Sequence, residues 1–95
     1  MTRSAVSYWP AVPRVEISAE AAHFFRRVPY KHALQIDARI QRLAAEPFPP
    51  GCLKLQGTAD VYRVRQGPYR IVYRLRRADG VLVIESIGDR KDIYR

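Results

Sequence analysis

The sequence has a single cysteine, Cys52, and no long apolar run. One cysteine can form no internal disulfide, and it has no second thiol with which to build a zinc site. No apolar run approaches the roughly 18 to 20 residues that span a bilayer, and the N-terminus lacks the charged and then apolar layout of a secretory signal. These absences predict a soluble, cytoplasmic protein that uses no metal or other cofactor.

Acidic residues are also scarce, because the 95 residues hold nine Asp and Glu against 17 Lys and Arg. The formal net charge is +8. Such an imbalance favours a polyanion or an acidic protein as the partner and says nothing about the fold. Nucleic acid is therefore the first candidate. A hydrophobic content of 47% suffices for one domain with a modest core.

Residues 1–13 show neither helical nor strand periodicity, which predicts an extended arm ahead of a domain over residues 14–95. The arm contains Tyr8 and Trp9, two aromatic side chains that would leave an exposed apolar patch if nothing covered them. They are expected to pack on this domain or on a partner.

Two helices are predicted in the first half of the domain. Ser18 can cap the first helix, expected over about residues 19–28, and Glu20 in its first turn suits the positive end of the helix dipole. A second helical pattern, with apolar residues at spacings of three and four, runs over about residues 30–46. Prolines and a glycine at 47–51 cannot continue this helix and mark a connection.

Strand patterns precede and follow the helices. They cover residues 14–17, where polar and apolar residues alternate, and three runs at about 60–66, 69–77 and 81–87. Short turns join the last three runs, which predicts an antiparallel meander. The resulting order is strand, helix, helix, strand, strand, strand. This order predicts an α+β fold in which an antiparallel sheet packs against the two helices.

Arginines alternate with apolar residues along the meander. Successive side chains on a strand point to opposite faces, so Arg63 and Arg65 lie on one face, and in-register pairing would add Arg70 from the next strand. Arg90 could join from the end of the last strand. Neighbouring guanidinium groups repel each other by roughly 1 kcal/mol or more per pair, a repulsion that a bound phosphate relieves. We expect these arginines to be exposed, so that alanine at Arg70 or Arg90 removes charge and leaves the core intact.

A cationic cluster of this kind could also cleave RNA. RNA carries its own nucleophile, the 2′-hydroxyl beside each phosphate, so cleavage needs only charge stabilisation and groups that move protons. Histidine would be the obvious acid or base, but His23 and His32 fall in the helical segments. Tyr94 is the better candidate, because arginines close by would favour its phenolate. The tyrosines that alternate with the arginines, and are expected to face the core, are Tyr62, Tyr69 and Tyr73.

Several segments of the chain closely resemble the RelE toxins of the RelE/ParE toxin–antitoxin superfamily. They are Lys54-Leu55-Gln56-Gly57, Tyr62-Arg63-Val64-Arg65, Tyr69-Arg70-Ile71-Val72-Tyr73 and Ile87-Gly88-Asp89-Arg90 through Tyr94. The resemblance covers about residues 14–95. It implies a microbial-RNase-like domain that enters the ribosomal A site and cuts the mRNA there, leaving a 2′,3′-cyclic phosphate and a 5′-hydroxyl.

The resemblance also implies catalytic roles for Arg63, Arg65, Arg70, Arg90 and Tyr94. Arg70 would stabilise the phosphate, Arg65 would lie near the general base, and Arg90 would neutralise charge or protonate the leaving group. Tyr94 would stack on a base or help to activate the 2′-hydroxyl. Arg63 and Arg65 stand where the family often has lysines, and arginine practically cannot lose its proton, so the identity of the base stays open. The segment between Arg90 and Tyr94 is shorter than in the best-known members.

Further contacts are expected beyond these five residues. RNA or ribosome contacts are expected from Lys54, Arg74, Arg76, Arg77 and Lys91, although such residues could equally be solvated surface arginines and lysines. A cognate acidic antitoxin would fold over the cationic groove, and operator DNA would be contacted only through the antitoxin complex. The alternative is a ParE-like toxin, which shares the fold, lacks the RNase residues and inhibits DNA gyrase by binding. The five-residue set favours the RNase.

Overall fold

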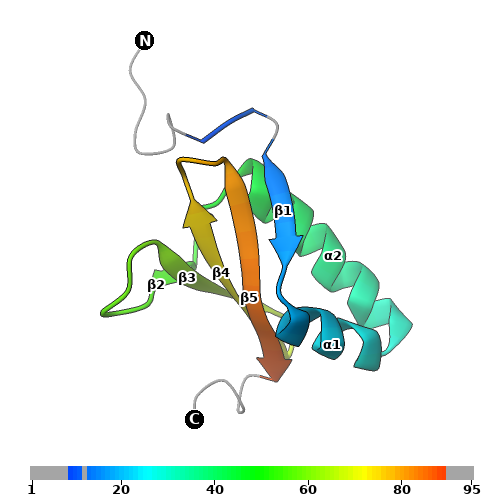
Figure 1. The fold of residues 1–95 in the computed structure, drawn as a ribbon. Helices are drawn as coiled ribbons and strands as arrows, with labels where there is room; N and C mark the ends of the chain where they lie inside the picture. Colours follow the sequence, from blue (N-terminus) through cyan, green and yellow to red (C-terminus); the bar gives the residue numbers. More distant parts are fainter. Residues whose placement is uncertain (1–8, 12, 90–95) are drawn as a thin grey trace.

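The computed structural model describes residues 9–11 and 13–89, which form two helices and a five-stranded sheet (Figure 1). The elements in chain order are β1 (Arg14–Ile17), α1 (Ala19–Arg27), α2 (Tyr30–Ala45), β2 (Leu53–Lys54), β3 (Val61–Gln66), β4 (Tyr69–Arg76) and β5 (Val81–Asp89). The predicted α+β fold is confirmed, since both helices follow the first strand and precede the meander. Strand β2 has no counterpart in the prediction, because two residues carry no periodicity.

The strands lie in the order β1-β5-β4-β3-β2. Strands β2 to β5 pair antiparallel, as the short turns predicted. Strand β1 instead runs parallel to β5, with Arg14 opposite Val81 and Ile17 opposite Ile84. The sheet is therefore mixed, and the prediction of an antiparallel sheet was wrong for this pair. A parallel pair needs a long crossover, which the two helices and the meander between β1 and β5 supply.

Helix α1 begins at a capping serine, as predicted. The side-chain oxygen of Ser18 accepts a hydrogen bond from the backbone N–H of Ala21 at 3.0 Å. The same hydroxyl donates to the carbonyl of Glu85 at 2.7 Å, which fastens the start of α1 to β5. The helix ends at Arg27, since Val28 precedes a proline and takes an extended conformation. Helix α1 thus lies beside the second half of β5, beyond the end of β1 (Figure 1).

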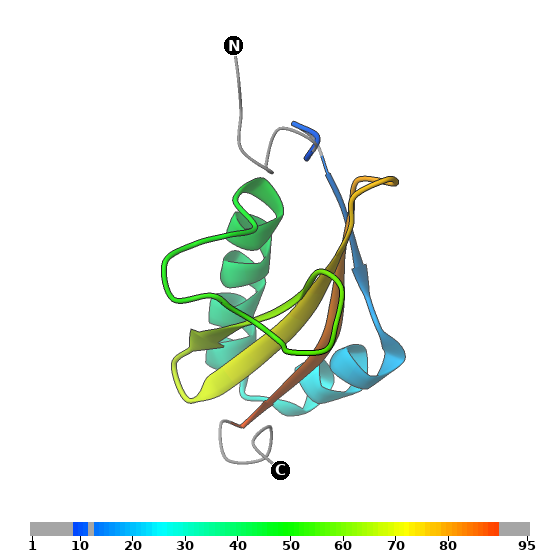
Figure 2. The ribbon, with the colours of Figure 1, turned by 90° about the vertical axis from the view of Figure 1, so that its left-hand side faces the viewer.

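Helix α2 covers one face of the sheet, as Figure 2 shows from the side. The buried helix residues are Ile36, Ile40, Leu43 and Ala44 from α2 and Ala21 from α1. The strand residues of the same core include Val64, Tyr69, Ile71, Tyr73 and Leu75, with Tyr62 partly buried against them. The prediction that the three tyrosines face the core is therefore confirmed. The described residues hold no helix that is long and apolar enough to cross a membrane.

Residues ahead of β1 pack onto the domain. Trp9 is partly buried against the core, and its indole N–H donates to the carbonyl of Ala44 near the end of α2. Pro10 lies against Gly80 in the turn between β4 and β5, where a Cβ on the glycine would come within 2.8 Å of the proline ring. Gly80 also has a φ of +68°, so both space and backbone favour glycine there. Trp9 is thus covered by this domain, while Tyr8 lies outside the described residues.

Candidate functional site

The face of the sheet opposite α2 carries the arginines of β3 and β4. Arg65 lies directly opposite Arg70, and Arg63 lies opposite Val72. Because directly opposite residues share a face, the structure brings Arg63, Arg65 and Arg70 together, as strand phase predicted. They line a hollow of about 370 Å³, here called the arginine groove. Its lining residues are Gly51, Leu53, Arg63, Val64, Arg65 and Arg70.

The three arginines differ in exposure. Arg70 is only 4% exposed, whereas Arg63 is half-buried and Arg65 is exposed. The expectation that Arg70 is an exposed charge was therefore wrong. A buried charge is costly unless its surroundings compensate it, and close packing restricts the rotamers of the side chain. Arg70 therefore presents a fixed positive charge to the groove, while Arg65 keeps more freedom in solvent.

Three of the predicted site residues lie outside the described residues: Arg90, Lys91 and Tyr94. The strand that leads to them is described as far as Asp89. On this strand Gly88 lies opposite Arg70, and Asp89 lies opposite Tyr69. Residue 90 therefore follows directly on a strand that is paired with the strand of Arg70. The catalytic and binding roles of these three residues stay predictions.

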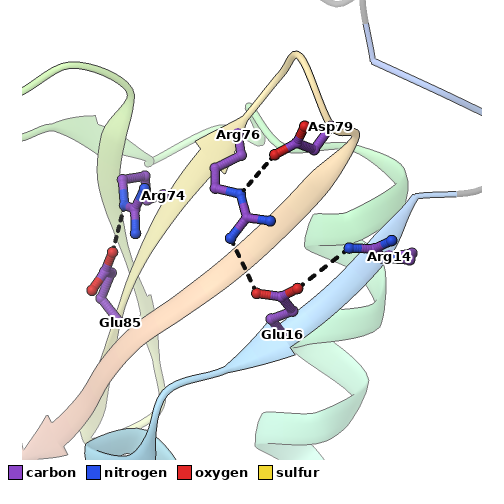
Figure 3. A network of polar contacts seen from close by, with 6 residues as sticks. All are labelled: Arg14, Glu16, Arg74, Arg76, Asp79 and Glu85. Atoms are coloured by element: carbon purple, nitrogen blue, oxygen red, sulfur yellow. Dashed lines mark hydrogen bonds and ion pairs between the residues drawn. The ribbon is translucent and has the colours of Figure 1, made fainter.

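Two of the predicted RNA contacts, Arg74 and Arg76, take part in ion pairs within the chain (Figure 3). The Arg74 guanidinium donates to the Glu85 carboxylate of the neighbouring strand at 2.6 Å. Arg76 reaches two carboxylates, Asp79 at 3.1 Å and Glu16 at 3.2 Å. Because carboxylates balance these charges, Arg74 and Arg76 attract a polyanion less strongly than they would as isolated arginines.

Arg77 is held in a two-point contact with Asp60. Its Nε donates to Oδ2 and its Nη2 donates to Oδ1, both at 2.8 Å. The hydrogen-bonded Arg77 guanidinium holds the pKa of the Asp60 carboxyl below its ordinary value, and Asp60 raises the pKa of Arg77 in turn. Asp60 has a φ of 59°, a left-handed conformation that aspartate adopts more readily than most residues. Lys54, in contrast, is exposed on β2, opposite Tyr62.

A second hollow, of about 530 Å³, adjoins the arginine groove, because Arg63 lines both. We call it the helix pocket. Helix α1 forms one wall with Glu20, Phe24 and Arg27, and the sheet forms the other with residues that include Val72 and Ser86. Of the lining residues, only Arg63 was a predicted site residue. The one local signal was Glu20, which the pattern indicated only as a favourable residue for the helix dipole.

The histidines lie on the helices, as predicted. His32 on α2 places its Nδ1 2.6 Å from the hydroxyl oxygen of Tyr69, and the two rings meet edge to face. His23 is exposed on α1. Neither histidine lines the arginine groove or the helix pocket. Among the residues that the structure describes, no group of three or more His, Cys, Asp or Glu side chains is placed to hold a metal ion.

Comparison with known proteins finds relatives of one kind. The family model for the ParE toxin of the type II toxin–antitoxin system parDE matches residues 15–94. A protein of Methanocaldococcus jannaschii that is named as the toxin RelE1 is 27% identical over 84 residues, which are 85% of this chain and 93% of that protein.

Solved structures give the same result. The archaeal RelE–RelB complex from Pyrococcus horikoshii OT3 has a TM-score of 0.72 and 30% identity, covering 82% of this chain and 94% of the other. The isolated E. coli RelE toxin has a TM-score of 0.74 and 21% identity, covering 87% and 92%. The RelBE2 toxin–antitoxin complex of Mycobacterium tuberculosis has a TM-score of 0.71 and 23% identity, covering 83% and 100%.

The ParE model matches nearly the whole predicted domain, so the chain belongs to this family, the toxins of type II toxin–antitoxin systems. Its archaeal relative at 30% identity is a RelE, and the other solved relatives above share the RelE fold. Within the RelE/ParE superfamily the chain is thus a toxin of the RelE type, as the resemblance in its sequence predicted.

Proposed function

We propose that this toxin is a metal-independent endoribonuclease that cuts mRNA in the A site of the ribosome. The observation that supports this best is the arginine groove, where Arg63, Arg65 and Arg70 line one hollow. Guanidinium groups stay charged and offer several N–H donors in a planar fork, which suits the oxygens of a phosphodiester. We include the ribosome in this proposal because the chain is a toxin of the RelE type.

In the proposed reaction the RNA 2′-hydroxyl attacks the adjacent phosphorus atom. The bond to the 5′ oxygen of the next nucleotide breaks, and a 2′,3′-cyclic phosphate and a 5′-hydroxyl form. Arg70 stabilises the charge that develops on the phosphoryl oxygens, because a donor that is fixed in advance needs no reorganisation. Arg65 lies opposite Arg70 and would flank the 2′-hydroxyl. Arg90 is proposed to protonate or neutralise the leaving oxygen, and Tyr94 to stack on a base or help to activate the 2′-hydroxyl.

A cognate antitoxin is the proposed partner. Solved relatives from P. horikoshii, E. coli and M. tuberculosis are complexes of toxin and antitoxin. The formal net charge of +8 favours a partner with an acidic segment, which could fold over the arginine groove on binding. We propose that contact with operator DNA arises only through this complex, that the protein acts in the cytoplasm, and that residues 14–95 form the toxin domain.

Primer extension on mRNA in programmed ribosomes tests the activity. Wild-type toxin should create new 5′ ends within the A-site codon. Arg65→Ala should reduce cleavage by about a hundredfold, because it removes an exposed donor that faces the phosphate. The matched control is Arg26→Ala, which removes an exposed arginine of α1 that lines neither hollow and should cut like wild type. Intact mRNA in the presence of folded wild-type toxin would refute the proposal.

The second candidate function is inhibition of DNA gyrase by binding. The name of the matching family model, ParE, favours it. In that case cells that express the toxin should accumulate gyrase-linked DNA breaks while mRNA in programmed ribosomes stays intact. The arginine groove argues for the RNase instead, because an inhibitor that acts by binding alone needs no groups that stabilise a phosphoryl transition state.

A further inference from the structure

The helix pocket adjoins the arginine groove, and apart from Arg63 its lining residues have no part in the cleavage chemistry proposed above. Its volume is about 530 Å³, against about 370 Å³ for the groove. We propose that the helix pocket is a subsite for one nucleobase of the RNA, and that Glu20 gives this subsite a preference for guanine. The inference rests on the proposed function and extends it to the base that lies next to the cut.

Continuity with the arginine groove supports a nucleotide as the ligand. Arg63 lines both hollows, so a phosphate held in the groove lies at the mouth of the helix pocket. If the groove binds the phosphate of a nucleotide, the sugar and base of that nucleotide must lie in a neighbouring site. The neighbouring hollow is of the size that small organic ligands occupy in proteins, roughly 300 to 1,000 Å³.

The inner surface of the helix pocket suits the flat face of a base. Phe24 of α1, Leu55 and Val72 contribute apolar surface to it. Phe24 is held in place by an edge-to-face contact with the buried Tyr69, with ring centroids 5.8 Å apart. Proteins that recognise single-stranded RNA commonly stack its bases on aromatic side chains in this way.

The rim of the helix pocket carries charge of both signs. Glu20, Phe24 and Arg27 stand at positions i, i+4 and i+7 of α1, so all three lie on the same face of the helix. Glu20 and Arg27 are exposed, and neither makes an ion pair with a residue that the structure describes. Glu16 and Glu85, in contrast, are neutralised by arginines. The Glu20 carboxylate therefore remains available to accept hydrogen bonds from a ligand.

Guanine fits this rim better than the other bases do. Its N1–H and its 2-amino group are adjacent donors, and they match the two oxygens of a carboxylate such as that of Glu20. Its O6 and N7 are adjacent acceptors, which is the arrangement that arginine reads in a bidentate contact, and Arg27 is the donor on the same rim. Adenine, cytosine and uracil each lack a pair of adjacent donors, so a carboxylate discriminates against them.

Mapping the cut sites of ribosome-bound mRNA tests the preference. Wild-type toxin should cut about tenfold faster where guanine stands at one fixed position beside the cut, as expected for one well-placed pair of hydrogen bonds. Glu20→Gln should remove that preference, so that codons with and without guanine at this position are cut at similar rates. Asp37→Asn, an exposed carboxylate of α2 that lines neither hollow, is the control and should keep it.

A second variant separates base recognition from helix stability. Glu20→Asp keeps a negative charge in the first turn of α1 but withdraws the carboxylate by one methylene, so the guanine preference should be lost while the helix is kept. If both Glu20 variants retain the wild-type preference, the proposal is overturned. It is also overturned if they change only the affinity for the antitoxin, because the helix pocket is then a peptide site.

A binding titration makes the outcome independent of cleavage. Guanosine 3′-monophosphate and adenosine 3′-monophosphate are titrated into the isotope-labelled toxin, and shifts of the Phe24 and Val72 resonances are followed. Guanosine 3′-monophosphate should bind about tenfold more tightly than adenosine 3′-monophosphate, and Glu20→Gln should abolish this difference in affinity. Wild-type toxin that prefers guanosine but cuts no mRNA would refute the nuclease and keep the base subsite. If the toxin cuts mRNA but shows no preference for guanine, either in its cut sites or in the titration, the base subsite is refuted and the nuclease is kept.

Discussion

Replacing Arg70 should separate its catalytic charge from its packing. The residue is 4% exposed and lies opposite Arg65 in the arginine groove. Arg70→Ala removes the guanidinium together with two buried methylenes of the stem. Arg70→Met removes the charge but keeps a long, unbranched side chain that can fill the same space. Both variants should lose ribosomal mRNA cleavage, because neither can donate to the phosphoryl oxygens, but only the alanine variant should also lose packing.

The size of the packing effect follows from the burial. A buried methylene contributes about 0.8 kcal/mol, so losing two of them from Arg70 lowers the free energy of unfolding by roughly 1.5 kcal/mol. Removing the charge beside Arg65 also relieves a repulsion of about 1 kcal/mol, but it does so equally in both variants. The electrostatic contribution therefore cancels between them. Arg70→Met should be more stable than Arg70→Ala by about 1 to 2 kcal/mol.

Urea unfolding followed by circular dichroism measures this difference, and primer extension at a temperature where both variants are folded measures cleavage. Arg65→Ala is the control for stability, because Arg65 is exposed and its loss removes the same repulsion without removing packing, so this variant should be no less stable than wild type. Cleavage by Arg70→Met at the wild-type rate would refute the assignment of Arg70 to the phosphate. Identical unfolding of the methionine and alanine variants would refute the reasoning from burial.

Three further substitutions test the fold. Tyr73→Phe leaves the buried Pro47 carbonyl without its donor and should lower the free energy of unfolding by about 1 to 3 kcal/mol; an unchanged urea midpoint would contradict this. Asp60→Ala should destabilise more than Asp60→Asn, because both lose the charge pairing with Arg77 but asparagine keeps one acceptor oxygen and still tolerates the left-handed backbone. Folding lowers the pKa of Asp60, so the stability that its charge contributes is complete above pH about 4 and is lost as the pH falls through the lowered pKa. The difference in free energy of unfolding between wild type and Asp60→Asn should therefore become smaller in acid. Ser18→Ala should cost about 0.5 to 2 kcal/mol in the same unfolding assay, whereas Ser18→Thr, which keeps the hydroxyl, should cost less.

Local patterns predicted the positions of the helices and the longer strands to within one or two residues. The reason is that their ends are marked by local chemistry, such as the cap at Ser18 and the proline after Val28. The parallel pairing of β1 with β5 escaped prediction because it joins distant segments. The hydrogen bond between Ser18 and Glu85, for example, spans 67 residues, and no short-range periodicity records it.

The candidate site likewise has features that local sequence patterns predict and features that they do not. The period of two along a strand is enough to place Arg63, Arg65 and Arg70 on one face, and the structure has them there. How deeply Arg70 is buried depends on what packs around the strand, which its own sequence neighbours do not specify. The helix pocket is harder still to predict, because its two walls come from segments far apart in the chain; Glu20 and Ser86, for example, both line it.

The position of β5 between β1 and β4 has a consequence for how the toxin folds during its synthesis. This strand is synthesised after the other four, yet it is the one that joins β1 to the rest of the sheet. The β3–β4 hairpin can form from local contacts, but β1 has no partner until residues 81–89 are made. We therefore expect the sheet to stay incomplete until β5 has been synthesised. The complete toxin fold would thus arise only after this strand has left the ribosome.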